Sequence, residues 1–130
     1  MTTDSDRVIT LYRPVGKTEF ELIRGSGFRA FPPRLPEQPF FYPVVTQAYA
    51  TRIARDWNTK DERSGFMGYV LRFIVRAAFL DSYETHTVGD SDHREYWIPA
   101  SDVDSFNQSI VGLIEVIAEY KGKSMTIPSS

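Results

Sequence analysis

Five of the eight prolines of this 130-residue chain fall within residues 28–43, where they are interleaved with aromatic residues. Proline lacks the backbone N–H and fixes φ, so this stretch cannot form a long helix. Polyproline ligands share this composition, but they are usually solvated tails, whereas this stretch lies in the middle of the chain. We therefore predict an ordered, partly buried loop, the kind of segment that often carries functional residues.

Composition excludes several classes of function. The chain is 42% hydrophobic and has 15 Lys and Arg against 17 Asp and Glu, as expected for one soluble domain. It has no cysteine, which excludes disulfides, thiolate metal sites and cysteine nucleophiles. A net charge of −2 provides no general attraction to nucleic acid or to a membrane. We expect a cytoplasmic protein without a membrane span or a nucleic-acid partner.

Hydrophobic periodicity predicts an α+β fold, with a small, mostly antiparallel sheet and two to three short helices. The domain is expected over residues 7–121, between a disordered tail (1–6) and a flexible C-terminal tail (122–130). The expected strands are residues 8–12, 40–45, 67–76, 82–88, 93–98 and 113–120. The expected helices are residues 17–24, the segment after Thr46, and residues 101–108.

Local signals refine these boundaries. Residues 67–76 alternate most clearly, so we expect this strand at the centre of the sheet. Pro14 is expected to end the first strand, because proline cannot donate to a ladder. Thr46 is placed to cap the helix that follows it. Ser101 and Asp104 have the spacing of a capping box.

The two histidines allow two interpretations. His86 and His93 flank a turn that contains Asp90 and Asp92, and such a set could chelate a divalent ion. Aspartate and serine are also the residues that a tight turn favours, so an ordinary hairpin turn is the stronger interpretation. We therefore expect no metal. The standard phosphate-binding glycine loops and the common hydrolase motifs do not occur in the sequence.

Three arginines lie in or near the proline-rich stretch. Arg24, Arg29 and Arg34 could form a patch facing an anion, since guanidinium forks suit phosphate and carboxylate. Scattered surface arginines are the alternative.

A third group consists of Arg13, the segment from Tyr42 to Thr46, and Glu95. An arginine can clamp a pyrophosphate, an aromatic residue can stack on a flat ring, and a carboxylate can stabilise an oxocarbenium ion. Together they suit chemistry at the glycosidic carbon of a nucleotide. Many domains of this size offer such residues at strand ends, so the residues alone leave the assignment open.

Longer motifs add a family resemblance. The series L-Y-R-P-V-G (11–16), F-P-P-R-L-P-E-Q-P (31–39), A-R-D-W-N (54–58) and H-R-E-Y-W-I-P-A (93–100) resembles small bacterial proteins of the ADP-ribosylation/crystallin J1 group. The likeness extends from about residue 11 to residue 120. Crystallin J1 relatives themselves are large and all-helical, whereas the element order here resembles the ADP-ribosyltransferase fold.

The transferase resemblance implies a site for NAD as the substrate. Tyr12-Arg13 matches the first motif of that fold, residues 41–50 are similar to the second, and residues 94–96 resemble the third. By this resemblance Glu95 is the catalytic residue that stabilises the cation left when nicotinamide departs. Arg13 orients the phosphates, Tyr42 packs on the nicotinamide, and Thr46 belongs to the NAD-binding segment. The implied activity is ADP-ribosyl transfer or NAD hydrolysis.

A non-catalytic interaction or regulatory domain on the same fold is the alternative. The second motif lacks the usual Ser-Thr-Ser, and His93 stands where many transferases have a second acidic residue or a glutamine. The aromatic residues of 28–42 could then form an apolar patch that faces an unknown protein partner. The partner of this chain is thus expected to be either a nucleotide or another protein.

Overall fold

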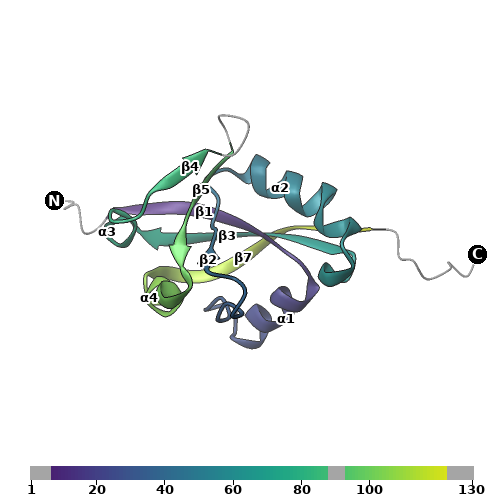
Figure 1. Cartoon of the computed structure of the whole chain (residues 1–130), viewed down its shortest axis with the longest axis horizontal. Helices are drawn as coiled ribbons and strands as arrows, with labels where there is room; N and C mark the ends of the chain where they lie inside the picture. The colour runs from purple at the N-terminus through teal and green to yellow at the C-terminus, as the bar shows by residue number, and fades with distance from the viewer. Residues whose placement is uncertain (1–6, 88–92, 123–130) are drawn as a thin grey trace, which may run out of the picture.

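The computed structural model describes residues 7–87 and 93–122, and its main feature is an antiparallel three-stranded sheet (Figure 1). The strand order is β1 (Val8–Val15), β3 (Met67–Arg76) and β7 (Ile110–Lys121). The predicted α+β class and the central position of strand 67–76 are therefore confirmed.

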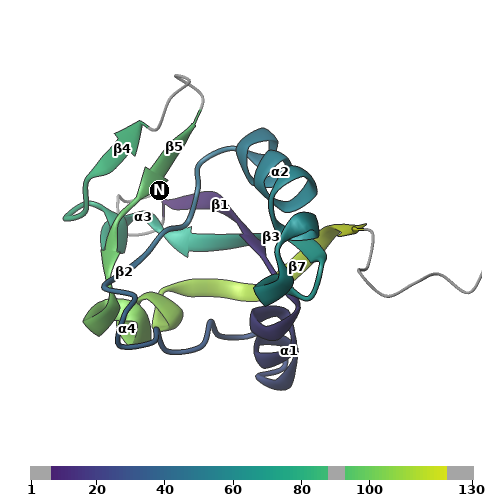
Figure 2. The same ribbon diagram turned by 45° about the vertical axis from the view of Figure 1, so that its right-hand side comes forward.

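Helices cover both faces of this sheet. Figure 2 shows α2 (Gln47–Asp56) on one side and α1 (Lys17–Gly25) and α4 (Val103–Gln108) on the other. The described residues also contain a short helix, α3 (Ala77–Leu80). It is only one turn long, which is too short to show a helical pattern of apolar residues in the sequence. Three-residue 3-10 helices span Asn58–Lys60, Glu62–Ser64 and Ala100–Asp102. None of the helices in the described ranges has the length and apolar character needed to cross a membrane.

Two short strand pairs lie outside the three-stranded sheet. β2 (Phe40–Phe41) pairs with β6 (Ile98–Pro99), and β4 (Thr85–Thr87) pairs with β5 (Arg94–Tyr96). Val44 forms isolated bridges with Tyr12 on one side and Glu95 on the other. The backbone order across this region is therefore β5, the segment around Val44, β1, β3 and β7.

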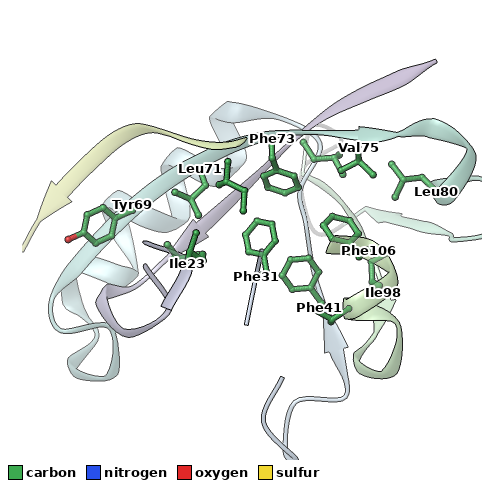
Figure 3. Packing of buried hydrophobic residues seen from close by; sticks show 14 residues of the cluster. Ile23, Phe31, Phe41, Tyr69, Leu71, Phe73, Val75, Leu80, Ile98 and Phe106 are labelled. Carbon is green, nitrogen blue, oxygen red and sulfur yellow. The ribbon is translucent and has the colours of Figure 1, made fainter. Parts of the chain in front are cut away.

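The main core lies between the sheet and the proline-rich stretch (Figure 3). Phe31 is 2% exposed, and its ring centroid lies 4.8 Å from that of Phe73 on β3. Phe41 packs edge-on against Phe106 of α4, with 5.1 Å between their centroids. The predicted ordered, partly buried loop is thus confirmed, because its aromatic residues supply much of the core.

A second, smaller core lies under α2. Val70 of β3 is buried against Ala50 and Ala54 of the helix. A Cβ atom at Gly68 would lie 2.1 Å from the carbonyl oxygen of Ala54. The close approach of α2 to the sheet therefore requires glycine at position 68.

The prediction that Pro14 ends the first strand is wrong. β1 continues to Val15, and Pro14 pairs with Val70. The N–H of Tyr12 points away from β3, to the carbonyl oxygen of Val44. Pro14 lies two residues further along, so its nitrogen also faces away from β3. Its missing donor therefore costs no hydrogen bond to the central strand.

The capping prediction at residues 101–108 is also wrong in detail. A helix occurs there, but it starts with a 3-10 turn, and no side-chain cap is formed at its start. Asp102, which precedes α4, instead accepts a hydrogen bond from the Tyr83 hydroxyl at 2.7 Å. The cap at Thr46 is confirmed, since its hydroxyl oxygen accepts the N–H of Tyr49 at 3.2 Å.

The last strand departs from simple alternation. β7 is longer than the predicted 113–120, and its pairing with β3 shifts register twice. Such bulges insert residues and so change which side chains face the core. Val116, which simple alternation places on the same face as the buried Ile114, is 41% exposed, and Gly112 takes the left-handed φ of +80°. Simple alternation predicts the wrong face for Val116 because it assumes a strand without bulges.

The remaining strands are shorter than predicted. Among the described residues, regular pairing covers Phe40–Phe41 of the expected strand 40–45, Thr85–Thr87 of the expected strand 82–88, and Arg94–Tyr96 and Ile98 of the expected strand 93–98. The predicted tail 1–6, residues 123–130 and most of the hairpin turn lie outside the described residues. Gly122, assigned to the C-terminal tail, donates its N–H to the Phe66 carbonyl at 2.8 Å.

Candidate functional site

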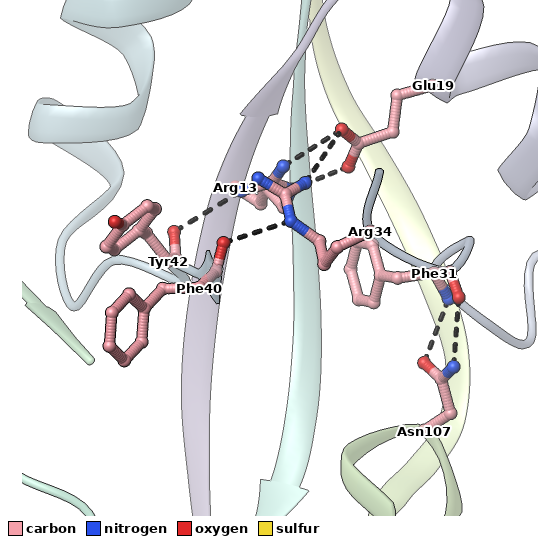
Figure 4. A network of polar contacts seen from close by, with 7 residues as sticks. All are labelled: Arg13, Glu19, Phe31, Arg34, Phe40, Tyr42 and Asn107. Carbon is pink, nitrogen blue, oxygen red and sulfur yellow. Dashed lines mark hydrogen bonds and ion pairs between the residues drawn. The ribbon is translucent and has the colours of Figure 1, made fainter. Parts of the chain in front are cut away.

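The Arg13 side chain projects from β1 toward α1 (Figure 4). Its Nε and Nη2 atoms donate to the two carboxylate oxygens of Glu19 at 2.6 and 2.9 Å. Nη1 donates to the carbonyl of Tyr42 at 3.4 Å, and the guanidinium carbon lies 4.6 Å from the centre of the Phe41 ring. Arg13 is 8% exposed, so the cation is held on several sides within the fold.

Arg34 of the proline-rich stretch lies beside Arg13. Its Nε donates to the Phe40 carbonyl at 3.0 Å, and Nη1 lies 4.0 Å from a Glu19 oxygen. Its side chain is 11% exposed. Burial, and next the charge of Arg13, lower the pKa of Arg34. We call Arg13, Glu19 and Arg34 the Arg13 cluster; it contains two cations and one carboxylate.

The three arginines that could have formed one patch do not come together, so the interpretation as scattered arginines fits Arg24 and Arg29. Arg24 makes an ion pair with Glu21 on the surface of α1, and Arg29 is exposed. Neither residue lines the cavity next to the Arg13 cluster, whereas Arg34 does. Arg34 is thus the one of these three arginines that lines a cavity.

A cavity of about 610 Å³ adjoins the Arg13 cluster. Its walls come from the end of β1, the first turns of α1, residues 32–38 and the 3-10 helices after α2. Leu22, Leu35 and Trp57 lie among its apolar lining residues and are 56%, 55% and 63% exposed. This volume suits a small organic molecule.

Glu95 lies in a different environment. It is half-buried on β5, and one carboxylate oxygen accepts the Tyr49 hydroxyl at 3.0 Å. Burial, followed by this hydrogen bond, raises the pKa of Tyr49 to about 12. At neutral pH Tyr49 is therefore a phenol that donates to the carboxylate and fixes its orientation.

Aromatic rings and both histidines surround Glu95. His86 is the cross-strand partner of Glu95, so the two side chains share a face of the hairpin. The His86 ring stacks on Trp97 with centroids 4.0 Å apart, and the His93 ring stacks on Tyr49 at 4.5 Å. Trp97 also contacts Tyr42. We call this set the Glu95 face; it consists of Tyr42, Tyr49, His86, His93, Glu95 and Trp97.

The structure does not bring Arg13 to Glu95. Tyr12 is the residue that pairs with Val44, which in turn pairs with Glu95. Successive side chains of a strand point to opposite faces, so Arg13 points to the face opposite Tyr12. Contacts agree, because Arg13 binds Glu19 of α1 whereas Glu95 binds Tyr49 of α2. The predicted site residues are thus divided between the two faces of β1.

Tyr42 and Thr46 lie between these two regions. The Tyr42 carbonyl contacts Arg13, but its ring packs against Trp97, and Figure 4 shows this ring pointing away from the guanidinium groups. The Thr46 hydroxyl caps α2. Tyr42 therefore belongs to the Glu95 face, and Thr46 positions the helix that carries Tyr49.

Sequence reasoning missed the roles of Tyr49 and Glu19. In the sequence, the i, i+4, i+8 spacing of Tyr49, Ile53 and Trp57 indicates only a helix face that packs on the core. Glu19 has only the position of an acidic residue near a helix start. The i+3 spacing of Tyr49 from Thr46 fixes the position of Tyr49 on the first turn, but its contact with Glu95 depends on tertiary pairing.

The possible metal site formed by His86, His93, Asp90 and Asp92 includes two residues that the structure does not describe, because Asp90 and Asp92 lie within 88–92. Within residues 7–87 and 93–122, no group of three or more histidines or carboxylates is placed to hold an ion.

Comparison with known proteins finds no match: no family model, no curated protein and no solved structure is significantly similar to this chain.

Proposed function

We propose that this chain is an ADP-ribosyltransferase-like domain that acts on NAD, by ADP-ribosyl transfer or by hydrolysis, with Glu95 as its catalytic residue. The observation that carries the proposal is the oriented Glu95 carboxylate, which accepts the Tyr49 hydroxyl at 3.0 Å. The two bridges at Val44 also bring together the segments that resemble the three transferase motifs.

The chemistry needs a fixed negative charge. When the bond between nicotinamide and ribose breaks, its electron pair leaves with nicotinamide, and positive charge develops on the ribose. A preorganised carboxylate stabilises that charge without having to reorient. Water or another acceptor then adds to the glycosidic carbon and releases a proton. The Tyr49 hydroxyl supports this role by holding the Glu95 carboxylate in place.

Flat rings near Glu95 support binding of the base. The half-buried ring of Tyr42 lies edge-on to Trp97, with centroids 5.7 Å apart. Trp97 is 37% exposed and therefore accessible for stacking. In this proposal Arg13 stabilises the fold through Glu19, because its side chain points to the opposite face of β1 from Glu95.

Nicotinamide release from NAD tests the proposal. We expect release by the unaltered chain and its loss in Glu95→Gln, which keeps the size of the side chain and removes its charge. Glu115→Gln is the matched control, because Glu115 of β7 is an exposed carboxylate that pairs with Arg72 of β3. Equal nicotinamide release by Glu95→Gln and the unaltered chain would show that Glu95 is not the catalytic residue. The absence of both NAD binding and nicotinamide release would reject the proposal.

A second candidate function is a non-catalytic interaction domain. The observation that favours it is the partly exposed aromatic group formed by Phe40, Tyr42 and Trp97, whose rings contact one another. This candidate predicts a melting temperature unaffected by NAD or ADP-ribose and a protein partner whose binding is lost in Trp97→Ala. Leu113→Ala is a suitable control, since Leu113 is 51% exposed on β7.

A further inference from the structure

The cavity beside the Arg13 cluster has an unusual polar wall. Two guanidinium groups lie in it with side-chain exposures of 10% and 11%, and Glu19 is the carboxylate they share. Arg13 uses two of its nitrogens in a bidentate contact with Glu19. Arg34 donates from Nε to a carbonyl, and its Nη atoms donate to no acceptor among the described residues.

This arrangement is incomplete as a purely structural ion pair. Removing a charged group from water is costly unless hydrogen bonds and opposite charge replace the lost hydration. One carboxylate balances one of the two guanidinium groups, which leaves one positive charge without an equal partner in the Arg13 cluster. The Nη atoms of Arg34 therefore have unused hydrogen-bond donors in the wall of a cavity.

We propose that this cavity binds a small organic monoanion, a carboxylate carried on an apolar or aromatic body, through Arg34 and the charge of the Arg13 cluster. A planar carboxylate matches the fork of a guanidinium group and can accept two parallel hydrogen bonds from it. Its single negative charge equals the unbalanced charge of the cluster.

The rest of the cavity favours a monoanion over a dianion. Beyond the Arg13 cluster, the lining contains two carboxylates, Glu37 and Asp61, and one cation, Arg63, so a second negative charge would meet an excess of carboxylate. Leu22, Leu35 and Trp57 are exposed apolar lining residues and would be covered by an apolar ligand body. Burial of this apolar surface contributes affinity in addition to the ion pair.

The inference is independent of the chemistry proposed for Glu95. Neither Glu95 nor Tyr49 lines this cavity, and β1 separates the Arg13 cluster from the Glu95 face. A result for NAD at the Glu95 face therefore neither supports nor rejects a carboxylate at Arg34.

Calorimetric titration with three matched probes tests this site. Benzoate is a monoanion on an aromatic ring, benzamide is its neutral analogue, and phenyl phosphate carries a second negative charge at elevated pH. At pH 8 we expect benzoate to bind at least about tenfold more tightly than benzamide, because the charged hydrogen bonds to Arg34 are lost in the neutral probe. We also expect benzoate to bind more tightly than phenyl phosphate.

Matched arginine variants locate the binding. Arg34→Gln is expected to weaken benzoate binding about tenfold or more, since it removes the charge and most of the donors. Arg24→Gln is the control, because Arg24 is a surface residue outside the cavity, and its benzoate affinity should remain within about twofold. Retention of the unaltered melting temperature by Arg34→Gln shows that the variant is folded.

The Nε–H signal of Arg34 in a nitrogen-15 NMR spectrum provides a second readout that does not require a variant. We expect this signal to shift on addition of benzoate. The proposal is overturned if benzoate leaves the signal unchanged, if benzoate and benzamide bind equally, or if neither binds at millimolar concentration. Tighter binding of phenyl phosphate than of benzoate would show that the cavity prefers a phosphate group to a carboxylate, and the proposed ligand class would be wrong.

Discussion

The Arg13 cluster and the Glu95 face each contain a carboxylate held by hydrogen bonds, but the two carboxylates lie in different surroundings. At Arg13 the charges are mostly buried and held by α1 and the proline-rich stretch. At Glu95 a half-buried carboxylate has one phenol partner and lies among stacked rings on the hairpin and α2. The comparison indicates that Arg13, whose three nitrogens all donate within the fold, stabilises the fold. Charged groups with fewer partners, Glu95 and the Nη atoms of Arg34, remain available to a ligand.

The largest expected effect is on stability at the buried cluster. Arg13→Ala removes the bidentate partner of Glu19 and the cation above the Phe41 ring. We expect the free energy of unfolding to fall by about 3 kcal/mol, because breaking a buried ion pair leaves a charge uncompensated. Urea denaturation measures the loss.

The matched control for this variant is Arg24→Ala, which breaks an exposed ion pair on α1. Its effect should stay within about 0.5 kcal/mol. Equal stability of Arg13→Ala and Arg24→Ala would contradict the structural role assigned to Arg13.

The next effect is on activity at the Glu95 face. Glu95→Gln should reduce the rate of nicotinamide release about 100-fold, the scale seen when one stabilising group is removed from a transition state. Its melting temperature should remain close to that of the unaltered chain, since Glu95 is half-buried and keeps an acceptor for Tyr49 as glutamine. A collapse of stability without a specific loss of activity would place Glu95 with the structural residues.

A smaller effect concerns the phenol that positions Glu95. The pKa of Tyr49 is raised to about 12, above its ordinary value of 10.0, by burial and then by its bond to Glu95. The folded state thus retains the phenolic proton after the unfolded state has lost it. Stability from this group is complete below pH 10 and declines as pH rises from about 10 to about 12.

Tyr49→Phe isolates that contribution. Over the same alkaline range, the free energy of unfolding should fall less steeply for this variant than for the unaltered chain. Tyr83→Phe should behave in the same way, because burial and then the bond to Asp102 raise the pKa of Tyr83 to about 12. Parallel curves for the unaltered chain and Tyr49→Phe would argue against the bond between Tyr49 and Glu95.

Periodicity predicted the fold better than the details within each strand. Strand 67–76 and the helices after Lys17 and Thr46 follow from patterns that depend only on neighbouring residues. The extension of β1 through Pro14 depends on which edge of the strand is unpaired, and the exposure of Val116 depends on bulges. Neither is encoded in a short window of sequence.

The candidate site shows the same division. Arg13 and Glu95 do lie on strands that are close in space, as their positions in the sequence suggested. The face to which each side chain points is set by the register of β1 against Val44 and of Val44 against Glu95. A shift of one residue would exchange the faces, and sequence alone gives no measure of that register.

A crossed NMR titration tests most directly whether the Arg13 cluster and the Glu95 face are separate sites. With NAD as the probe, we expect shifts of the backbone signals of Tyr49 and of residues 94–97 and no shift of the Arg13 and Arg34 Nε–H signals. With benzoate we expect the reverse. If NAD shifts both sets of signals with one common affinity, Arg13 and Glu95 belong to a single cleft, and the division into two sites is wrong.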